Sequence, residues 1–261
     1  MKETDHLIVT LHPNGVRELQ LHRPQQRNAF DSALIQSLTL AIADAEQDPN
    51  TRLLLLSASG EYFCAGADIA WMKAAKDFTT EENIADAEKL GKLLEALYHF
   101  PKPTIAKVQG SAFGGAIGLI CACDIAVGVI DAKLSFSEVR LGLVPAMISP
   151  YVVQAIGSRL AKKYFLTAEV FTASVAERMG LFTEVVPKNQ LDQTIDELLH
   201  SLLLGGEKAQ VVAKQLCLRQ ENGQRISTNV LANLLAIVRT SDEAQEGLSA
   251  FLDKRDPKWK K

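Results

Sequence analysis

The stretch that decides the fold covers residues 104–145 and reads TIAKVQGSAFGGAIGLICACDIAVGVIDAKLSFSEVRLGLVP. It opens with residues 104–108, an apolar run rich in β-branched side chains, which is typical of a buried strand. Gly110, Gly114 and Gly115 interrupt the sequence before the apolar segment 116–123. The pattern predicts a buried strand that leads through a glycine turn into a helix.

Such a turn can bind a ligand through its backbone. The first N–H groups of a helix have no partner inside it and carry the positive end of the helix dipole, so they can bind an oxygen on which negative charge develops. The wording GSAFGG matches neither GxxxxGK[ST] nor GxGxxG, the common phosphate-binding loops. The sequence therefore does not predict a phosphate loop here.

A second glycine break follows another apolar run, residues 53–56, in the wording SASGEYFCAGADIAWM. Gly66 precedes Ala67, Asp68 and Ile69 in this segment. Taken alone, the loop would merely connect two elements, and Asp68 would cap a helix. Two such breaks at the carboxyl ends of strands could supply the two converging donors of an oxyanion hole.

Residues 133–139 alternate and predict a strand that ends near a carboxylate. Leu134, Phe136 and Glu138 fall on one face of this strand. If that face is interior, desolvation would raise the pKa of Glu138 towards that of a useful general acid or base. Alternatively, Glu138 lies in water at a frayed strand end or pairs with Arg140.

Composition excludes several classes of function. The chain has 261 residues, 47% of them hydrophobic and 23% charged, with a net charge of −3, as in an ordinary soluble globular protein of one large or two small domains. This balance gives no support for nonspecific nucleic-acid binding. Four cysteines, at positions 64, 121, 123 and 217, lack metal-ligand spacing, so we expect reduced thiols and no metal site.

The first residues show no apolar core of a signal peptide, and no apolar run is long enough to span a bilayer. We therefore expect no membrane partner and a cytoplasmic protein, or an organelle-matrix form without its presequence. Asn14-Gly15 between two short apolar runs predicts an initial β-hairpin. Residues 189–253 are predicted to be almost wholly helical, to cover the core or to form a subunit interface.

The chain resembles the crotonase superfamily, the enoyl-CoA hydratases and isomerases, over essentially its whole length. The resemblance is carried by motifs in the order and at the spacing of the family: Arg23-Pro24, Asn28-Ala29, FCAGADI at 63–69, Lys102-Pro103, Gly110, Ala112, Gly114-Gly115, Cys123-Asp124, Phe251 and Lys254-Arg255.

This resemblance implies an α/β fold of repeated ββα units, a spiral core in residues 1–200, with a helical region 201–261 that builds homotrimers or homohexamers. It implies an acyl-CoA substrate, with coenzyme A as part of the substrate and no separate cofactor. The thioester oxygen would lie between the N–H groups of Ala67 and Gly115, with Glu138 moving protons. The remaining expected substrate contacts are Ala65, Asp68, Ile69, Gly114, Gly118 and Arg27, the last near the ADP part of CoA.

One departure from the family pattern affects the expected chemistry. Hydratases of this family typically carry two glutamates; Glu138 matches the second, whereas Gly118 occupies the position of the first. One glutamate could serve both proton transfers, and Gly118 would leave room for a bulkier or carboxylated acyl group. The wording around 110–152 is similar to that of hydratases of branched, carboxylated enoyl-CoAs, the methylglutaconyl-CoA and carboxygeranoyl-CoA type.

The sequence thus predicts an enoyl-CoA hydratase and leaves two alternatives open. A Δ3,Δ2-enoyl-CoA isomerase needs only one base, which the glycine at position 118 favours. A non-catalytic paralogue that binds acyl-CoA or RNA is the alternative from another class, and the acidic balance argues against RNA.

Overall fold

The computed structural model describes residues 2–3, 6–221, 223 and 225–260. The chain forms two compact units, one of residues 1–100 and 104–195, the other of residues 101–103 and 196–261. The boundary that the resemblance predicts lies at 200/201.

A seven-stranded sheet forms the centre of the first unit. Its strands lie in the order β1 (Lys2–Glu3), β2 (Leu7–Leu11), β3 (Val16–Leu21), β4 (Leu53–Ala58), β5 (Thr104–Val108), β7 (Ile125–Val129) and β10 (Glu184–Val186). The first three strands pair antiparallel, and those from β3 to β10 pair parallel. The predicted hairpin is confirmed, because β2 and β3 pair across a turn in which Gly15 has φ +88°.

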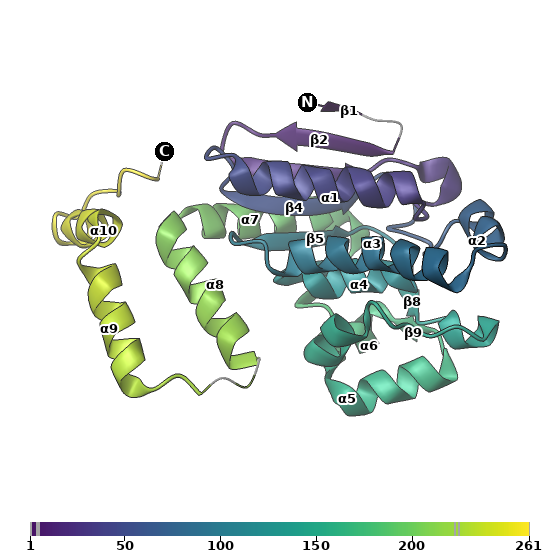
Figure 1. The fold of residues 1–261 in the computed structure, drawn as a ribbon. Helices are drawn as coiled ribbons and strands as arrows, with labels where there is room; N and C mark the ends of the chain where they lie inside the picture. The colour runs from purple at the N-terminus through teal and green to yellow at the C-terminus, as the bar shows by residue number, and fades with distance from the viewer. Residues whose placement is uncertain (1, 4–5, 222, 224, 261) are drawn as a thin grey trace. The chain divides into compact units, whose positions relative to one another are not determined.

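Helix α3 (Thr80–Tyr98) packs against both α1 (Ser32–Gln47) and α4 (Gly115–Ala122), and α1 also contacts β2 and β3 (Figure 1). Every residue of β4 is buried, as expected of a continuous apolar strand covered on both faces. Thr79 and Glu82 form a capping box that fixes the start of α3. The turn between β5 and α4 is therefore held from several sides.

A second, three-stranded sheet has the order β6 (Ala112–Phe113), β8 (Lys133–Ser135) and β9 (Phe171–Thr172). The predicted strand 133–139 is too long, because β8 ends at Ser135 and the 3₁₀ helix η2 (Glu138–Leu141) follows. Leu134, Ser135 and Phe136 are all buried, so both faces of this strand are covered. The alternation of apolar and polar residues in the sequence therefore did not distinguish an interior face from an exposed one. Glu138 consequently lies on η2 and on no strand.

The remaining elements of the first unit are short or peripheral: η1 (Pro24–Gln26), α2 (Ile69–Ala75), α5 (Ser149–Thr167), α6 (Ala173–Met179) and η3 (Lys188–Gln190). In Figure 1, β8 and β9 lie beside α5 and α6. Helix α7 (Leu191–Leu203) crosses the division between the units at residue 195.

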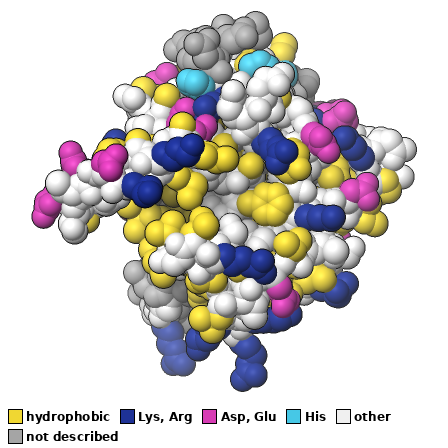
Figure 2. All heavy atoms as spheres, turned by 90° about the vertical axis from the view of Figure 1, so that its right-hand side faces the viewer, with side chains coloured by type: hydrophobic (Ala, Val, Ile, Leu, Met, Phe, Trp, Pro, Cys, Tyr) yellow, Lys and Arg dark blue, Asp and Glu magenta, His cyan; other side chains and the backbone are white. Residues whose placement is uncertain are grey.

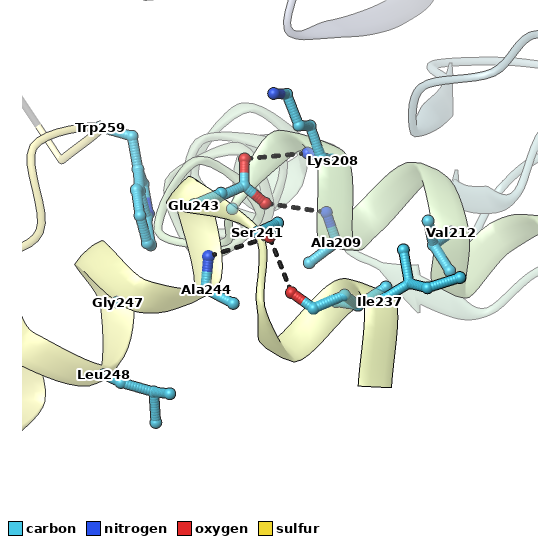
Figure 3. Close-up of a pocket in the computed structure, with 12 residues that line it drawn as sticks. Lys208, Ala209, Val212, Ile237, Ser241, Glu243, Ala244, Gly247, Leu248 and Trp259 are labelled. Atoms are coloured by element: carbon cyan, nitrogen blue, oxygen red, sulfur yellow. Dashed lines mark hydrogen bonds between the residues drawn. The ribbon is translucent and has the colours of Figure 1, made fainter. Parts of the chain in front are cut away.

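The second unit contains α8 (Glu207–Glu221), α9 (Thr228–Arg239) and α10 (Asp242–Leu252). Glu243 at the start of α10 accepts hydrogen bonds from the N–H groups of Lys208 (3.0 Å) and Ala209 (2.9 Å), as Figure 3 shows. These bonds satisfy unpaired donors in the first turn of α8. Trp259 closes one side of an apolar pocket between α8 and α10 and donates its indole N–H to the Leu204 carbonyl (3.0 Å).

Within the described residues, no helix combines the length and apolar character that crossing a membrane would require. No cluster of three or more His, Cys, Asp or Glu side chains that could hold a metal ion occurs in that part of the chain. The described cysteines are all free thiols.

Candidate active site

The two glycine-containing loops lie side by side and are joined by backbone hydrogen bonds. The Phe63 N–H donates to the Ser111 carbonyl (3.1 Å), and the Phe113 N–H donates to the Cys64 carbonyl (3.1 Å). Gly66 has φ +90°, and a Cβ atom there would lie 2.9 Å from the Phe113 carbonyl oxygen. Glycine is therefore required both by the local conformation and by the approach of the second loop.

The first loop holds the N–H of Ala67 away from its neighbours. Ala67 pairs with Phe30 in a parallel bridge, in which the Phe30 N–H donates to the Gly66 carbonyl (2.7 Å) and the Asp68 N–H donates to the Phe30 carbonyl (2.7 Å). In such a bridge the middle residue directs its own N–H away from the partner strand. Ala67 is exposed, and its N–H has no acceptor among the residues that the structure describes.

The second loop presents the N–H of Gly115 at the start of α4. Gly114 is the N-cap, with φ +54°, and its N–H donates to the Ser135 carbonyl (3.0 Å). The Gly115 N–H belongs to the first turn of α4, and the described part of the chain offers it no acceptor. An oxygen that gains negative charge would be stabilised there.

Phe30 connects the two loops, and the sequence analysis did not identify it. Its backbone pairs with Ala67, while its buried ring lies against Gly115, where a Cβ atom would be 3.4 Å from the ring edge. The two candidate donors thus lie against one residue. Only the position of Phe30 after the Asn28-Ala29 motif could have drawn attention to it.

The carboxylate of Asp68 has partners within the protein. Its carboxylate caps α2 by accepting from the Ala70 N–H (2.8 Å), and it pairs with Arg23 (3.2 Å). Arg23 also pairs with Asp31 (3.0 Å) and donates to the Ala29 carbonyl (2.6 Å). The simpler interpretation of Asp68, a helix cap, is confirmed, and its ion pair anchors the loop that carries Ala67.

Arg27 and Ala65 are neighbours on the surface beside this loop. The Ala65 N–H donates to the Arg27 carbonyl (3.0 Å), and the guanidinium of Arg27 lies 4.9 Å from the centre of the Tyr62 ring. Arg27 is exposed and has φ +51°. Ile69, the first residue of α2, is also exposed.

Glu138 lies directly over the second loop. One carboxylate oxygen, Oε1, is 3.1 Å from the position that a Cβ atom on Gly114 would occupy. The other oxygen, Oε2, is buried and has no hydrogen-bond partner in the described protein. Burial raises the pKa of Glu138, partly offset by a hydrogen bond from its own backbone.

Glu138 is half-buried, with one carboxylate oxygen in the interior, and it lies on η2 in place of the predicted strand. Among the described residues, no ion pair joins Glu138 to Arg140, whose side chain is exposed. A carboxyl group with a raised pKa and an unpaired oxygen can accept and return a proton.

The expected vacancy beside Gly118 is not present. A Cβ atom on Gly118 would lie 2.3 Å from Cγ2 of Ile148, and Gly118 is buried inside α4. Ile148 is itself buried, at 2% exposure. The prediction that Gly118 leaves room for a larger acyl group is wrong, because the side chain of a residue thirty positions later fills that space.

The face of the first unit that carries α2 is apolar in its middle. Figure 2 shows hydrophobic side chains gathered there, with Lys and Arg side chains around them. Exposed apolar residues in the two segments next to the site are Ile69, Leu141, Leu143 and Val144. Such a surface suits a ligand with an apolar chain and a negatively charged group.

The sequence profile of enoyl-CoA hydratase/isomerase matches residues 12–261, which include both loops and Glu138. The chain belongs to the enoyl-CoA hydratase/isomerase family. Two solved structures superpose on it closely: an enoyl-CoA hydratase from Shewanella pealeana (TM-score 0.92, 40% identity, 97% of this chain and 96% of that one) and Pseudomonas aeruginosa AtuE (TM-score 0.93, 33% identity, 98% and 100%).

The 2,3-dehydroadipyl-CoA hydratase of Escherichia coli is 31% identical over 245 residues, which cover 93% of this chain and 94% of that protein. These similarities confirm the crotonase resemblance and the α/β fold with helices at the C-terminal end. Family membership makes the chain an enzyme of acyl-CoA chemistry, a hydratase or an isomerase.

Proposed function

We propose that this protein adds water across the α,β double bond of a branched or carboxylated 2-enoyl-CoA, with Glu138 as its single proton-transfer residue. The observation that carries the proposal is the Glu138 carboxylate, buried on one oxygen, unpaired, and seated on the Gly114-Gly115 turn. The hydratase names of relatives at about 30% identity support hydration over isomerisation.

In the proposed reaction the thioester oxygen accepts hydrogen bonds from the N–H groups of Ala67 and Gly115. The Glu138 carboxylate takes a proton from water as the water oxygen bonds to C3, and the electrons of the double bond move to the thioester, forming an enolate. Glu138 then returns the proton to C2 and the thioester carbonyl reforms. One water is consumed, and Glu138 ends in the state in which it began.

The raised pKa of Glu138 suits this double role, because it makes the ionised carboxylate a stronger base than usual. A stronger base accepts a proton from water more readily. The buried surroundings also strengthen the hydrogen bonds to the enolate oxygen. Arg140, two residues further along η2 and exposed, is our candidate for pairing with a distal carboxylate on the acyl group.

The isomerase is the second candidate, and the glycine at position 118 favours it. With Gly118 in place of a glutamate, the site has one carboxylate at the two family positions, which is sufficient to move a proton from carbon to carbon. We therefore test both functions with crotonyl-CoA, 3-methylcrotonyl-CoA, 3-methylglutaconyl-CoA and 3-hexenoyl-CoA in heavy-oxygen water, and identify products by mass.

Heavy oxygen in a branched or carboxylated product is the expected result. Double-bond migration without oxygen uptake would replace the hydratase by the isomerase. Binding of acyl-CoA without any turnover, or salt-sensitive binding of RNA, would indicate the non-catalytic alternative.

Self-association as a homotrimer or homohexamer is part of this proposal. Helices α9 and α10 expose an unusual number of large apolar side chains for a soluble surface: Val230, Leu231, Leu235, Ile237, Leu248, Phe251 and Leu252. Sedimentation analysis should find a mass of three or six chains, and a monomer at micromolar concentration would contradict this part of the proposal.

A further inference from the structure

Ile148 occupies the space that a side chain at position 118 would need. A Cβ atom on Gly118 would lie 2.3 Å from Cγ2 and 2.9 Å from Cβ of Ile148, and 3.4 Å from Cδ2 of Leu94. Ile148 is the N-cap of α5 and is 2% exposed, so it is held among packed neighbours. No side chain at position 118 fits without moving it.

Glu138 and Ile148 contact two glycines of one segment. Gly114 is the N-cap of α4, with non-helical φ and ψ, and Gly118 lies inside the helix, about one turn or roughly 5 Å further along. The Glu138 carboxylate lies over the first position and the Ile148 side chain over the second. The proton-transfer group therefore has an aliphatic neighbour at the place where a second carboxylate would otherwise stand.

This arrangement bears on the acyl group. If the thioester oxygen lies at the Gly115 N–H, C3 lies two bonds beyond the carbonyl carbon, so a substituent on C3 is long enough to contact the next turn of α4, about 5 Å along the helix. We infer that Ile148 is a specificity-determining residue, which closes the site to a second carboxylate at position 118 and limits the size of the substituent on C3. The inference rests on the proposed acyl-CoA site, but it does not depend on hydration as the reaction.

The first test measures the contact itself through thermal stability. Gly→Ala inside a helix normally stabilises, but Gly118→Ala should lower the Tm by roughly 3–10 °C, because it overpacks a buried site. In the Ile148→Ala background, where the 2.3 Å contact is gone, Gly118→Ala should leave the Tm unchanged or raise it. This reversal of sign is a coupling between neighbours.

Gly91→Ala is the matched control for this cycle. Gly91 lies inside α3, and its added Cβ would be 3.2 Å from the flexible end of Met147. Its effect on the Tm should be small and equal in the two backgrounds. Equal effects of Gly118→Ala in both backgrounds would overturn the inference, because the contact would then impose no constraint.

The second test measures specificity by equilibrium binding of two saturated thioesters, butanoyl-CoA and 3-methylbutanoyl-CoA. Ile148→Ala should shift the ratio of their Kd values towards the branched ligand by about 10-fold or more, the usual effect of one methyl group in an apolar pocket. Ile156→Ala, at another buried position of α5, is the control that loses stability without moving the ratio.

An unchanged ratio in Ile148→Ala would overturn the specificity role, and failure of the wild-type protein to bind either thioester would overturn the inference together with the acyl-CoA site. Failure of hydration alone, with the ratio shifted as expected, would contradict only the proposed reaction and leave Ile148 as the residue that limits the acyl group.

Discussion

Gly66→Ala tests whether the contact between the two loops positions the Ala67 donor. Two costs add at this position. The positive φ of +90° would strain an L-residue by about 1–2 kcal/mol. The new Cβ, 2.9 Å from the Phe113 carbonyl oxygen, adds an overpacking cost of about 1–3 kcal/mol, since backbone cannot rotate away as a side chain can. We expect a total loss of about 2–5 kcal/mol in the free energy of unfolding.

Gly142→Ala is the matched control, because Gly142 has φ +71° but nothing lies within 4 Å of its added Cβ. It should show the conformational strain alone, about 1–2 kcal/mol. Urea unfolding gives both values on the same scale. The activity of Gly66→Ala is measured as kcat/KM on the substrate found by the product assay, and it should fall at least about 10-fold. The largest expected fall is that caused by complete loss of one oxyanion donor, about 100- to 1,000-fold.

Equal losses of stability in Gly66→Ala and Gly142→Ala would refute the steric argument. Undiminished kcat/KM in a destabilised Gly66→Ala would refute the link between the loop contact and the Ala67 N–H.

Four further predictions concern three side chains. Glu138→Gln should bind acyl-CoA normally and lose about 100- to 10,000-fold in kcat, and the wild-type rate should fall as the pH falls through the raised pKa of Glu138; a pH profile unaltered by the substitution would contradict this. Because the folded state binds this proton more tightly than the unfolded state (pKa 4.5), the free energy of unfolding of the wild type should decline relative to Glu138→Gln as the pH rises between the two pKa values, as urea titrations at several pH values would show. Asn28→Ala should destabilise the protein by about 2–4 kcal/mol, because a buried amide that donates to the carbonyls of Ser59 and Tyr62 (2.8 Å each) is lost; a loss below about 1 kcal/mol in urea unfolding would argue against this role. Arg140→Gln should raise KM about 10-fold or more for a substrate with a distal carboxylate and leave the KM for crotonyl-CoA unchanged. An equal change in KM for both substrates would show that Arg140 does not recognise the distal carboxylate.

The sequence was informative where local chemistry determines structure. Glycines after apolar runs identified both loops, since a turn with positive φ and a close backbone approach each exclude side chains. The helix cap expected of Asp68 taken alone is confirmed for the same local reason, whereas its role as a substrate contact stays a prediction. The roles of Ala67 and Gly115 as donors stay predictions that the product assay and the Gly66 variants test.

The sequence was misleading where distant segments meet. The alternation around Leu134 and Phe136 indicated an interior side for Glu138, which is half-buried with one buried oxygen. The strand itself ends three residues earlier, and Ser135 on its other face is buried as well, so the alternation did not separate an inner from an outer face. The apparent room beside Gly118 was wrong, because no local pattern shows that Ile148, thirty residues later, packs into it. Periodicity describes one segment at a time, whereas cavities depend on several.

The position of Phe30 has a consequence for how this site can change. Its backbone pairs with the residue that carries one candidate donor, and its ring supports the residue that carries the other. The separation of the two donors therefore depends on one residue, through the reach from the backbone of Phe30 to the edge of its ring. Substitutions that move one donor will also move the other, so we expect their effects on catalysis to be strongly non-additive. Laboratory evolution of new acyl specificity should therefore change the side chains around the site and leave Phe30 unchanged.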